Sequence, residues 1–432
     1  MSWDDDELAN PVGIRLREIE LPPGFDVQRA LIVGRRSKRR RQRIVALAAA
    51  VAVTGAIGVA AVALRHENPH PQPLQFPAPV VVDAVAPLRP AYHEICSVTP
   101  LEGPPGMTVG GLIVDPTGRF IVSTAWRPNG PMFPILYRDN AYTRLDETKQ
   151  WIAVNSSGVV VGIDPPNRDG RPRGAYVQRD GVMHRLAVPA GFTMAVPTAI
   201  NDQGDVFGTL LHDNGMDRDG FSDIGVRYDL RTIETRGLRV AVWPAGAPDS
   251  PRLLGVPASA EAEAVGFGSS GLMVGNLHHD PGYNETPYAW DPTGARGPLP
   301  LPDGWAGFTV EIVRGDFVIG QIMPPNYIPD PSLVPNVTQS VNLVRGGWAR
   351  WNTRTSKVEV FSRETTVWAA NAAGWLLLTG SSPDYPTVLV APDGTSRLLW
   401  GLEHVRWISD DGKRLVGYAT QGDGHLGRWT CP

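Results

Sequence analysis

The chain has few of the residues and none of the short motifs on which most recognisable enzymes depend. Its 432 residues include two cysteines and nine histidines, and only four of its forty basic residues are lysine. No Gly-x-Ser-x-Gly elbow, His-Glu-x-x-His zinc motif, phosphate loop or dinucleotide fingerprint is present. These absences exclude the enzyme classes that a short motif reveals. A catalytic pair assembled from distant segments stays open.

A clustered basic surface is also missing outside the N-terminal region. Residues 1–43 carry ten Lys/Arg against seven Asp/Glu, a charge of +3, so the rest of the chain contributes −7 to the net charge of −4. Nucleic-acid binding requires clustered positive charge, so we expect no nucleic-acid partner.

One long apolar run stands out, at residues 44–64, where 21 residues carry no charge. That length spans a bilayer core as a helix. The preceding GRRSKRRRQR stretch predicts a cytoplasmic N-terminus and an extracellular C-terminal part. A signal peptide cleaved after Ala61-Val62-Ala63 is the alternative, but the long leader and long apolar run favour a single-pass anchor in the cell membrane.

The segments around this run look too polar or too rich in proline to fold alone. Residues 1–43 predict a cytoplasmic tail, and residues 22–43 resemble juxtamembrane segments of actinobacterial membrane proteins, some of them linked to extracytoplasmic-function sigma factors. That resemblance implies a cytoplasmic regulator as a partner. Residues 65–92 contain seven prolines and predict an extended stalk that holds the following domain clear of the membrane.

From residue 93 onward the chain repeats one pattern seven times. A small or apolar run leads into a polar turn such as Asn-Asp-Gln-Gly, and an apolar strand follows. A second hairpin comes next, usually with an aromatic residue at the end of its first strand. The turns centre on Gly118, Gly158, Gly204, Gly271, Gly315, Gly374 and Gly412. Four short strands per repeat predict an all-β fold, a seven-bladed β-propeller over residues 93–432.

The two ends of this region predict how the ring closes. The seventh repeat stops one strand short, and the segment that begins at Cys96 matches the missing strand. The only cysteines, Cys96 and Cys431, lie in these two strands, so we expect a disulfide between them. By loop entropy, such a bond contributes on the order of 4–5 kcal/mol at most. Two buried free thiols are the alternative.

The repeat lines resemble those of bacterial extracellular HAF-type repeat proteins. The resemblance is carried by TAINDQGDVFGTL (198–210) and IAVNSSGVVVGI (152–163), which share an Ala-x-x-Asn-x-x-Gly-x-Val-x-Gly form. It implies a propeller outside the cell and implies no reaction. Asp115-Pro116 and the short fifth turn depart from the form.

Two places could carry chemistry. Asp217, Asp219 and Asp223 in the third repeat resemble the calcium loop of FG-GAP blades, so Ca²⁺ is the one cofactor we expect, with a solvated acidic loop as the alternative. His278-His279-Asp280 predicts a surface loop, because adjacent side chains in a strand point to opposite faces. The insertion at residues 323–340 predicts a long rim loop.

We therefore expect a binding or sensing module for a cell-wall or protein ligand rather than an enzyme. A propeller hydrolase or lyase that acts on a cell-wall or extracellular polymer is the first alternative. A transmembrane partner of a cytoplasmic regulator, such as a sigma factor, is the second.

Overall fold

The computed structural model describes much of the chain after residue 72. The described ranges are residues 73–83, 93–94, 96–127, 130–165, 174–211, 237–258, 260–279, 285–323, 347–361, 365–380, 387–399, 402–419 and 426–431. Within these ranges no helix is long and apolar enough to cross a membrane. The predicted cytoplasmic tail and the predicted helix at residues 44–64 lie outside the described residues.

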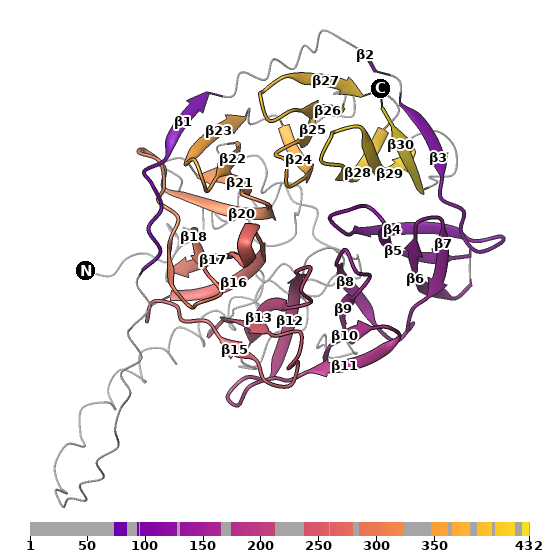
Figure 1. Cartoon of the computed structure of the whole chain (residues 1–432), viewed down its shortest axis with the longest axis horizontal. Coiled ribbons are helices and arrows are strands. Elements are labelled where there is room, and N and C mark those ends of the chain that lie inside the picture. The colour runs from indigo at the N-terminus through magenta and orange to yellow at the C-terminus, as the bar shows by residue number, and fades with distance from the viewer. Residues whose placement is uncertain are drawn as a thin grey trace, which may run out of the picture. The chain divides into compact units, whose positions relative to one another are not determined.

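Seven antiparallel sheets arranged around one axis confirm the predicted β-propeller (Figure 1). The first three blades are β4 (Thr108–Val114), β5 (Phe120–Trp126), β6 (Met132–Arg138) and β7 (Ala141–Arg144); β8 (Gln150–Val154), β9 (Val160–Ile163), β10 (Ala175–Arg179) and β11 (Val182–Leu186); and β12 (Met194–Ile200), β13 (Val206–Leu211), β14 (Arg239–Trp243) and β15 (Arg252–Leu253). The next three are β16 (Ala260–Phe267), β17 (Met273–His279), β18 (Glu285–Trp290) and β19 (Arg296–Pro298); β20 (Gly307–Arg314), β21 (Phe317–Met323), β22 (Trp348–Asn352) and β23 (Lys357–Phe361); and β24 (Thr365–Ala370), β25 (Leu376–Gly380), β26 (Thr387–Val390) and β27 (Ser396–Leu399).

Blade 7 joins the two ends of the ring, as the sequence predicted. Its strands are β28 (Leu402–Ile408), β29 (Arg414–Ala419), β30 (Leu426–Thr430) and β3 (Ser97–Pro100). β3 pairs antiparallel with β30, and Ser97 lies opposite Thr430. Beside this pair, Cys96 and Cys431 form the expected disulfide across a sequence separation of 335 residues.

The repeated turns form because a polar side chain binds the backbone of its own hairpin. Asn155 opens the turn of blade 2, and its Oδ1 accepts hydrogen bonds from the backbone N–H groups of Ser157 and Val159. Gly158 has φ of +81°, and a Cβ there would lie 2.6 Å from the Phe120 ring of blade 1. Glycine is therefore needed for both the backbone conformation and the contact between blades.

The core is divided into seven apolar clusters, one at each junction between neighbouring blades. The aromatic residues that the repeat placed on the third strands fill several of them. Trp243, Trp290 and Trp351 are fully buried. The indole N–H groups of Trp243 and Trp290 donate to the backbone carbonyls of Ala187 and Gly255, so each large ring is buried with its polar atom satisfied.

The Pro-rich segment differs from the stalk that its composition predicted. Residues 73–83, which we call the belt, lie along the outer edges of blades 4 and 5 (Figure 1). Leu74 N–H donates to the Arg296 carbonyl, and β1 (Val80–Asp83) pairs in parallel with β23. Farther on, β2 (His93–Glu94) pairs in parallel with β27 of blade 6. The compact unit accordingly begins at Pro69 rather than at residue 93.

In residues 73–77 alternate side chains face the ring, which allows a test. Leu74 and Phe76 pack partly against the blade 4–5 cluster, whereas Gln75 is exposed. We expect Leu74→Ala with Phe76→Ala to lower the free energy of unfolding by about 1–3 kcal/mol, because apolar contact is lost. Urea unfolding measures this. Gln75→Ala should change the value by less than about 0.5 kcal/mol. Equal effects of the two changes would contradict the pairing.

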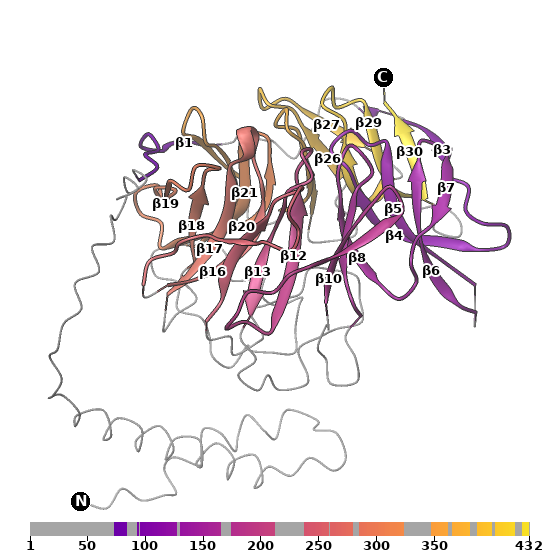
Figure 2. The same ribbon diagram turned by 60° about the horizontal axis from the view of Figure 1, so that its bottom comes forward.

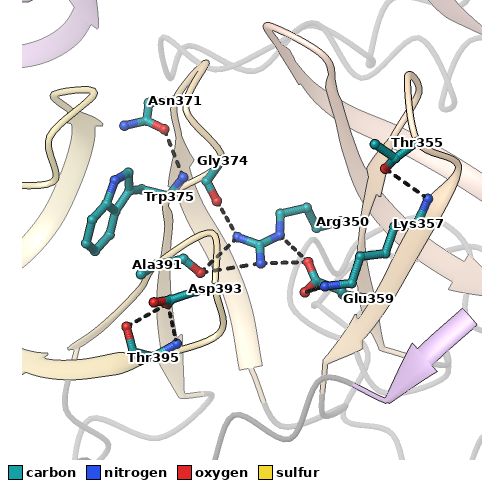
Figure 3. A network of polar contacts seen from close by, with 10 residues as sticks. All are labelled: Arg350, Thr355, Lys357, Glu359, Asn371, Gly374, Trp375, Ala391, Asp393 and Thr395. Carbon is teal, nitrogen blue, oxygen red and sulfur yellow. Dashed lines mark hydrogen bonds and ion pairs between the residues drawn. The ribbon is translucent and has the colours of Figure 1, made fainter.

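The buried side chain of Arg350, which is ion-paired with Glu359 within blade 5, also binds blade 6 (Figure 3). Arg350 is 1% exposed, and its Nε lies 2.6 Å from Glu359 Oε2. Its Nη1 donates to the backbone carbonyls of Gly374 and Ala391 in blade 6. Lys357, whose side chain is 46% exposed, contacts the other Glu359 oxygen at 2.9 Å. Arg350 thus has acceptors in both blades.

Removal of either cation leaves Glu359 with one partner, but the two losses are unequal. We expect Arg350→Ala to lower the free energy of unfolding by about 3–5 kcal/mol, because it orphans buried acceptors in two blades. Lys357→Ala should cost less than about 1 kcal/mol, since its ammonium is half exposed. Thermal and urea denaturation of both variants provide the measurement. Comparable losses would show that Arg350 does not join the blades.

Candidate functional site

Strand direction gives the propeller two different faces (Figure 2). Strands alternate in direction within each blade, so the turns from first to second strand and from third to fourth strand share one face, the turn face. The connections from second to third strand and from blade to blade share the other, the loop face. Both large insertions, residues 212–236 and 324–346, leave and re-enter the ring at the loop face.

The turn face is held by hydrogen bonds between neighbouring turns. Asn155 Nδ2 donates to the Asn201 carbonyl, and Asn371 Nδ2 donates to the Ser409 carbonyl. Trp407 Nε1 in blade 7 donates to the Pro116 carbonyl in blade 1. The polar groups that define the turns are therefore engaged in holding the blades together, and we regard this face as scaffold.

On the loop face, a cavity of about 310 Å³ lies at the junction of blades 3 and 4. Its walls come from the blade connections and from the start of β14. The lining residues are Phe192, Arg239, Leu253, Leu254, Gly255, Val256, Pro257 and Ala258. Leu253 is 49% exposed and adds apolar surface to the rim of the cavity.

Arg239 is the only charged residue of this lining. Its Nη1 donates to the carbonyls of Leu238 and Ala260, at 2.8 and 3.4 Å. Within the described residues its Nε and Nη2 make no hydrogen bond. This cavity has an apolar wall beside a guanidinium whose Nε–H and Nη2–H groups can still donate hydrogen bonds. Such an arrangement suits a ligand that carries both an apolar group and a negative charge.

A histidine between carboxylates lies next to this cavity. In the sheet register His278 is opposite Glu261 on one side and Glu285 on the other. His278 Nε2 is 3.5 Å from Glu263 Oε2, and its Nδ1 is 3.8 Å from Glu285 Oε1. Glu261 in turn accepts a hydrogen bond from the N–H of Gly237, two residues from Arg239. Such a group can hold or transfer a proton.

A second polar group, in blade 2, is already satisfied by its own members. Lys149 Nζ lies 2.5 Å from Asp164 Oδ1, and the Tyr176 hydroxyl donates to Asp164 Oδ2 at 3.2 Å. Burial acts to lower the pKa of Lys149, but its hydrogen bond to Asp164 and the charge of Asp164 outweigh burial and raise it. The lysine therefore stays charged at neutral pH.

Of the site residues predicted from the sequence, the structure describes His278 but not the acidic loop of the third repeat. Asp217, Asp219 and Asp223 lie outside the described residues, so the calcium prediction stays a prediction. Among the residues that are described, no three His, Cys, Asp or Glu side chains are placed to hold a metal ion. His278 belongs to a strand rather than to a surface loop, and its partners come from the strands on either side.

The cavity residues were not found from the sequence. Phe192, Arg239 and Leu253 are distributed over three separate segments, and none belongs to a motif. The one available signal was the apolar Leu253-Leu254 pair at the end of the blade 3 repeat, which indicated only a strand.

Comparison with known proteins assigns no family. No family model matches the sequence, and no curated protein matches it. Among solved structures, an acylaminoacyl peptidase in complex with Z-Gly-Gly-Phe-chloromethyl ketone is 11% identical over 75% of this chain and 51% of its own, with a TM-score of 0.48. The β-propeller domain of the Trilobed protease from Pyrococcus furiosus is 10% identical over 75% of this chain and 95% of its own, with a TM-score of 0.46.

A putative TolB from Agrobacterium tumefaciens is 8% identical over 76% of this chain and 91% of its own, with a TM-score of 0.33. The chain spans about half the length of the first peptidase structures that it resembles. The likeness concerns architecture alone, and the propeller assignment depends on the seven sheets themselves.

Proposed function

We propose that this chain is a single-pass membrane protein whose extracellular propeller binds or senses a cell-surface ligand at its loop face. The observation that carries the proposal is the Arg239 cavity, a concave apolar surface with one guanidinium on the face where both insertions begin and end. The opposite face is occupied by hydrogen bonds between turns. A rigid scaffold that carries loops of variable length on one face is a common arrangement for binding.

The disulfide supports an extracellular location for the propeller. Cys96 and Cys431 are the only cysteines of the chain, and they are bonded to each other. Such bonds persist in oxidising compartments and are rare in the cytosol. The basic stretch before residue 44 supports the same topology, with the tail of residues 1–43 on the cytoplasmic side, where it would meet a regulator such as a sigma factor.

The topology has a direct test on the full chain in cells. We expect the protein to stay with membranes after alkaline carbonate extraction, because an anchored helix is not released by charge disruption. Protease added outside intact cells should remove the propeller and leave the tail. A soluble product with a new N-terminus after Ala63 would show a cleaved signal peptide instead.

The ligand-binding role predicts that variants of the two faces behave differently. We expect Arg239→Ala to weaken co-sedimentation of the detergent-purified full chain with an isolated cell-wall or surface-protein fraction by about tenfold, since a charge-assisted hydrogen bond contributes about 1.5–3 kcal/mol. Arg119→Ala is the matched control on the turn face, where that side chain is 52% exposed. Equal binding by both variants and the unchanged protein would refute the loop-face site.

The same assay tests the proposed calcium site when it is run with calcium and with a chelator. A loss of binding or of thermal stability on chelation, absent after Asp217→Asn with Asp219→Asn and Asp223→Asn, would assign Ca²⁺ to the blade 3 insertion. Identical curves in both buffers would show that the acidic loop holds no cation.

A hydrolase or lyase is the second candidate function, and one observation favours it. His278 lies between Glu263 and Glu285 beside the cavity, an arrangement that can serve general acid–base catalysis. Analysis of the cell-wall fraction recovered from the binding assay separates the two functions, because an enzyme releases fragments from it with time and a binding module returns it unchanged.

A further inference from the structure

The belt places the first described residues on the outer edge of blade 4. Leu74 N–H donates to the Arg296 carbonyl at 3.1 Å, and the Leu74 carbonyl oxygen lies 2.6 Å from where a Cβ of Gly297 would be. Only glycine allows so close an approach of the two backbones. The chain therefore joins the ring at β19, and Arg296 lies beside the point where it does so.

Little chain separates this point from the predicted membrane span. Eight residues, 65–72, lie between the end of the apolar run at residue 64 and the first described residue, Pro73. A fully extended chain of this length reaches about 30 Å. If residues 44–64 anchor the protein, the outer edge of blade 4 cannot move farther than this from the bilayer.

Two exposed arginines at this edge reach from one blade to the next. Arg252 begins β15 and Arg296 begins β19. The Arg252 guanidinium lies at the turn before β19, 3.6 Å from where a Cβ of Gly294 would be. In the other direction, the Arg296 guanidinium lies against Gly255 of blade 3. Within the described residues neither guanidinium makes a hydrogen bond or an ion pair, so both can bind an anion outside the protein.

An acidic residue lies in each of the turns that lead into β15 and β19, and each bonds within its own turn. Asp249 Oδ1 accepts a hydrogen bond from the Ser250 hydroxyl at 3.3 Å. Asp291 Oδ1 accepts from the Thr293 hydroxyl and from the Ala295 N–H, at 2.7 and 2.9 Å. Neither carboxylate is ion-paired with an arginine.

The belt continues this surface onto blade 5 (Figure 2). Val80 and Val81 of β1 are 61% and 44% exposed, although both are apolar. Val80 N–H donates to the Ser356 carbonyl, two residues from Arg354. The Arg354 side chain is 81% exposed, and its ion pair with Asp316 is 4.0 Å long. Exposed apolar area and positive charge are the two features that bind a protein to an anionic membrane surface.

Comparison of the seven blades shows that the fold does not require these cations. In blades 3 to 6 one of the first two residues of the outer strand is basic: Arg252, Arg296, Lys357 and Arg397. The outer strands of blades 1, 2 and 7 begin with Ala141-Tyr142, Val182-Met183 and Ser97-Val98. Lys357 contacts Glu359, and Arg397 lies over the Trp375 ring, so these two are used within the protein. The arginines of blades 3 and 4 have no such use.

We propose that the basic rim, formed by Arg252, Arg296 and Arg354 with Val80 and Val81, docks on the anionic lipid headgroups of the membrane that holds the anchor. The guanidinium groups bind lipid phosphates, whose geometry they match, and the valines contact the interface. This inference rests on the single-pass topology proposed above. Because β15 and β19 begin at the turn face, docking by the rim leaves the loop face clear of the bilayer for an outside ligand.

The test follows the full chain in nanodiscs made either of phosphatidylcholine or of an equimolar mixture with phosphatidylglycerol. Because the two native cysteines are bonded to each other, a dye on Gln75→Cys labels the exposed side of the belt. Single-molecule energy transfer from this dye to labelled headgroups counts docked and undocked propellers. We expect docking to predominate in anionic discs at low salt, and to be lost in neutral discs or at high salt.

Removal of charge from two sides of the ring separates docking from a general effect of charge. Arg252→Gln with Arg296→Gln should lower the docked-to-undocked ratio about 30-fold, since each basic residue near an anionic surface contributes about 1 kcal/mol. Arg119→Gln with Arg138→Gln removes the same charge from blade 1 and should leave the ratio unchanged. All four side chains are exposed, so both variants should keep the melting temperature of the unchanged protein.

The outcomes distinguish the docking from the anchor. A chain that fails to enter the discs would refute the anchor and the docking together. An inserted chain that docks equally in neutral and anionic discs would refute the docking alone. The same conclusion would follow if the blade 1 variant lost as much docking as the variant of Arg252 and Arg296.

Discussion

The pairing of β3 with β30 is the constraint on which the rest of the structure depends. In this chain the last sheet receives its fourth strand from the other end of the propeller, and the Cys96–Cys431 disulfide holds these two strands together. With the ring closed, each blade is packed on both faces and every junction has its own apolar cluster. Closure also forces the seven inner strands to surround one axis.

Closure of the ring gives the two faces different kinds of connection. Antiparallel blades must send their short turns to one face and their other connections to the opposite one. The turns lie close enough for Asn155 to reach Asn201 and for Trp407 to reach Pro116, so side-chain hydrogen bonds join several neighbouring turns on that face. Connections on the other face can vary in length without disturbing the ring, and both large insertions leave and re-enter the ring there.

The sequence predicted the blades, the closure and the disulfide because each depends on local chemistry that repeats. A polar side chain that caps its own turn recurs in most copies, and a Gly with positive φ recurs in all of them. The belt was missed because its strand partners lie far away in the chain: Val80 pairs with Lys357, and prolines alone indicate only an extended segment. The partners of His278 were missed for the same reason, since Glu263 and Glu285 meet it only across the sheet.

Seven copies of one unit provide an internal comparison, and departures from the common pattern fall into two kinds. In blade 6, Val390 replaces the aromatic residue of the third strand, and the neighbouring Ala391 carbonyl accepts from buried Arg350 of blade 5. That departure coincides with a contact that holds blades together, so it belongs to the scaffold. Glu311 and Arg406 lie three residues before their turns, where the other blades carry Leu112, Ile152, Thr198, Val265 or Trp368, so this second kind of departure changes the charge of the inner strands.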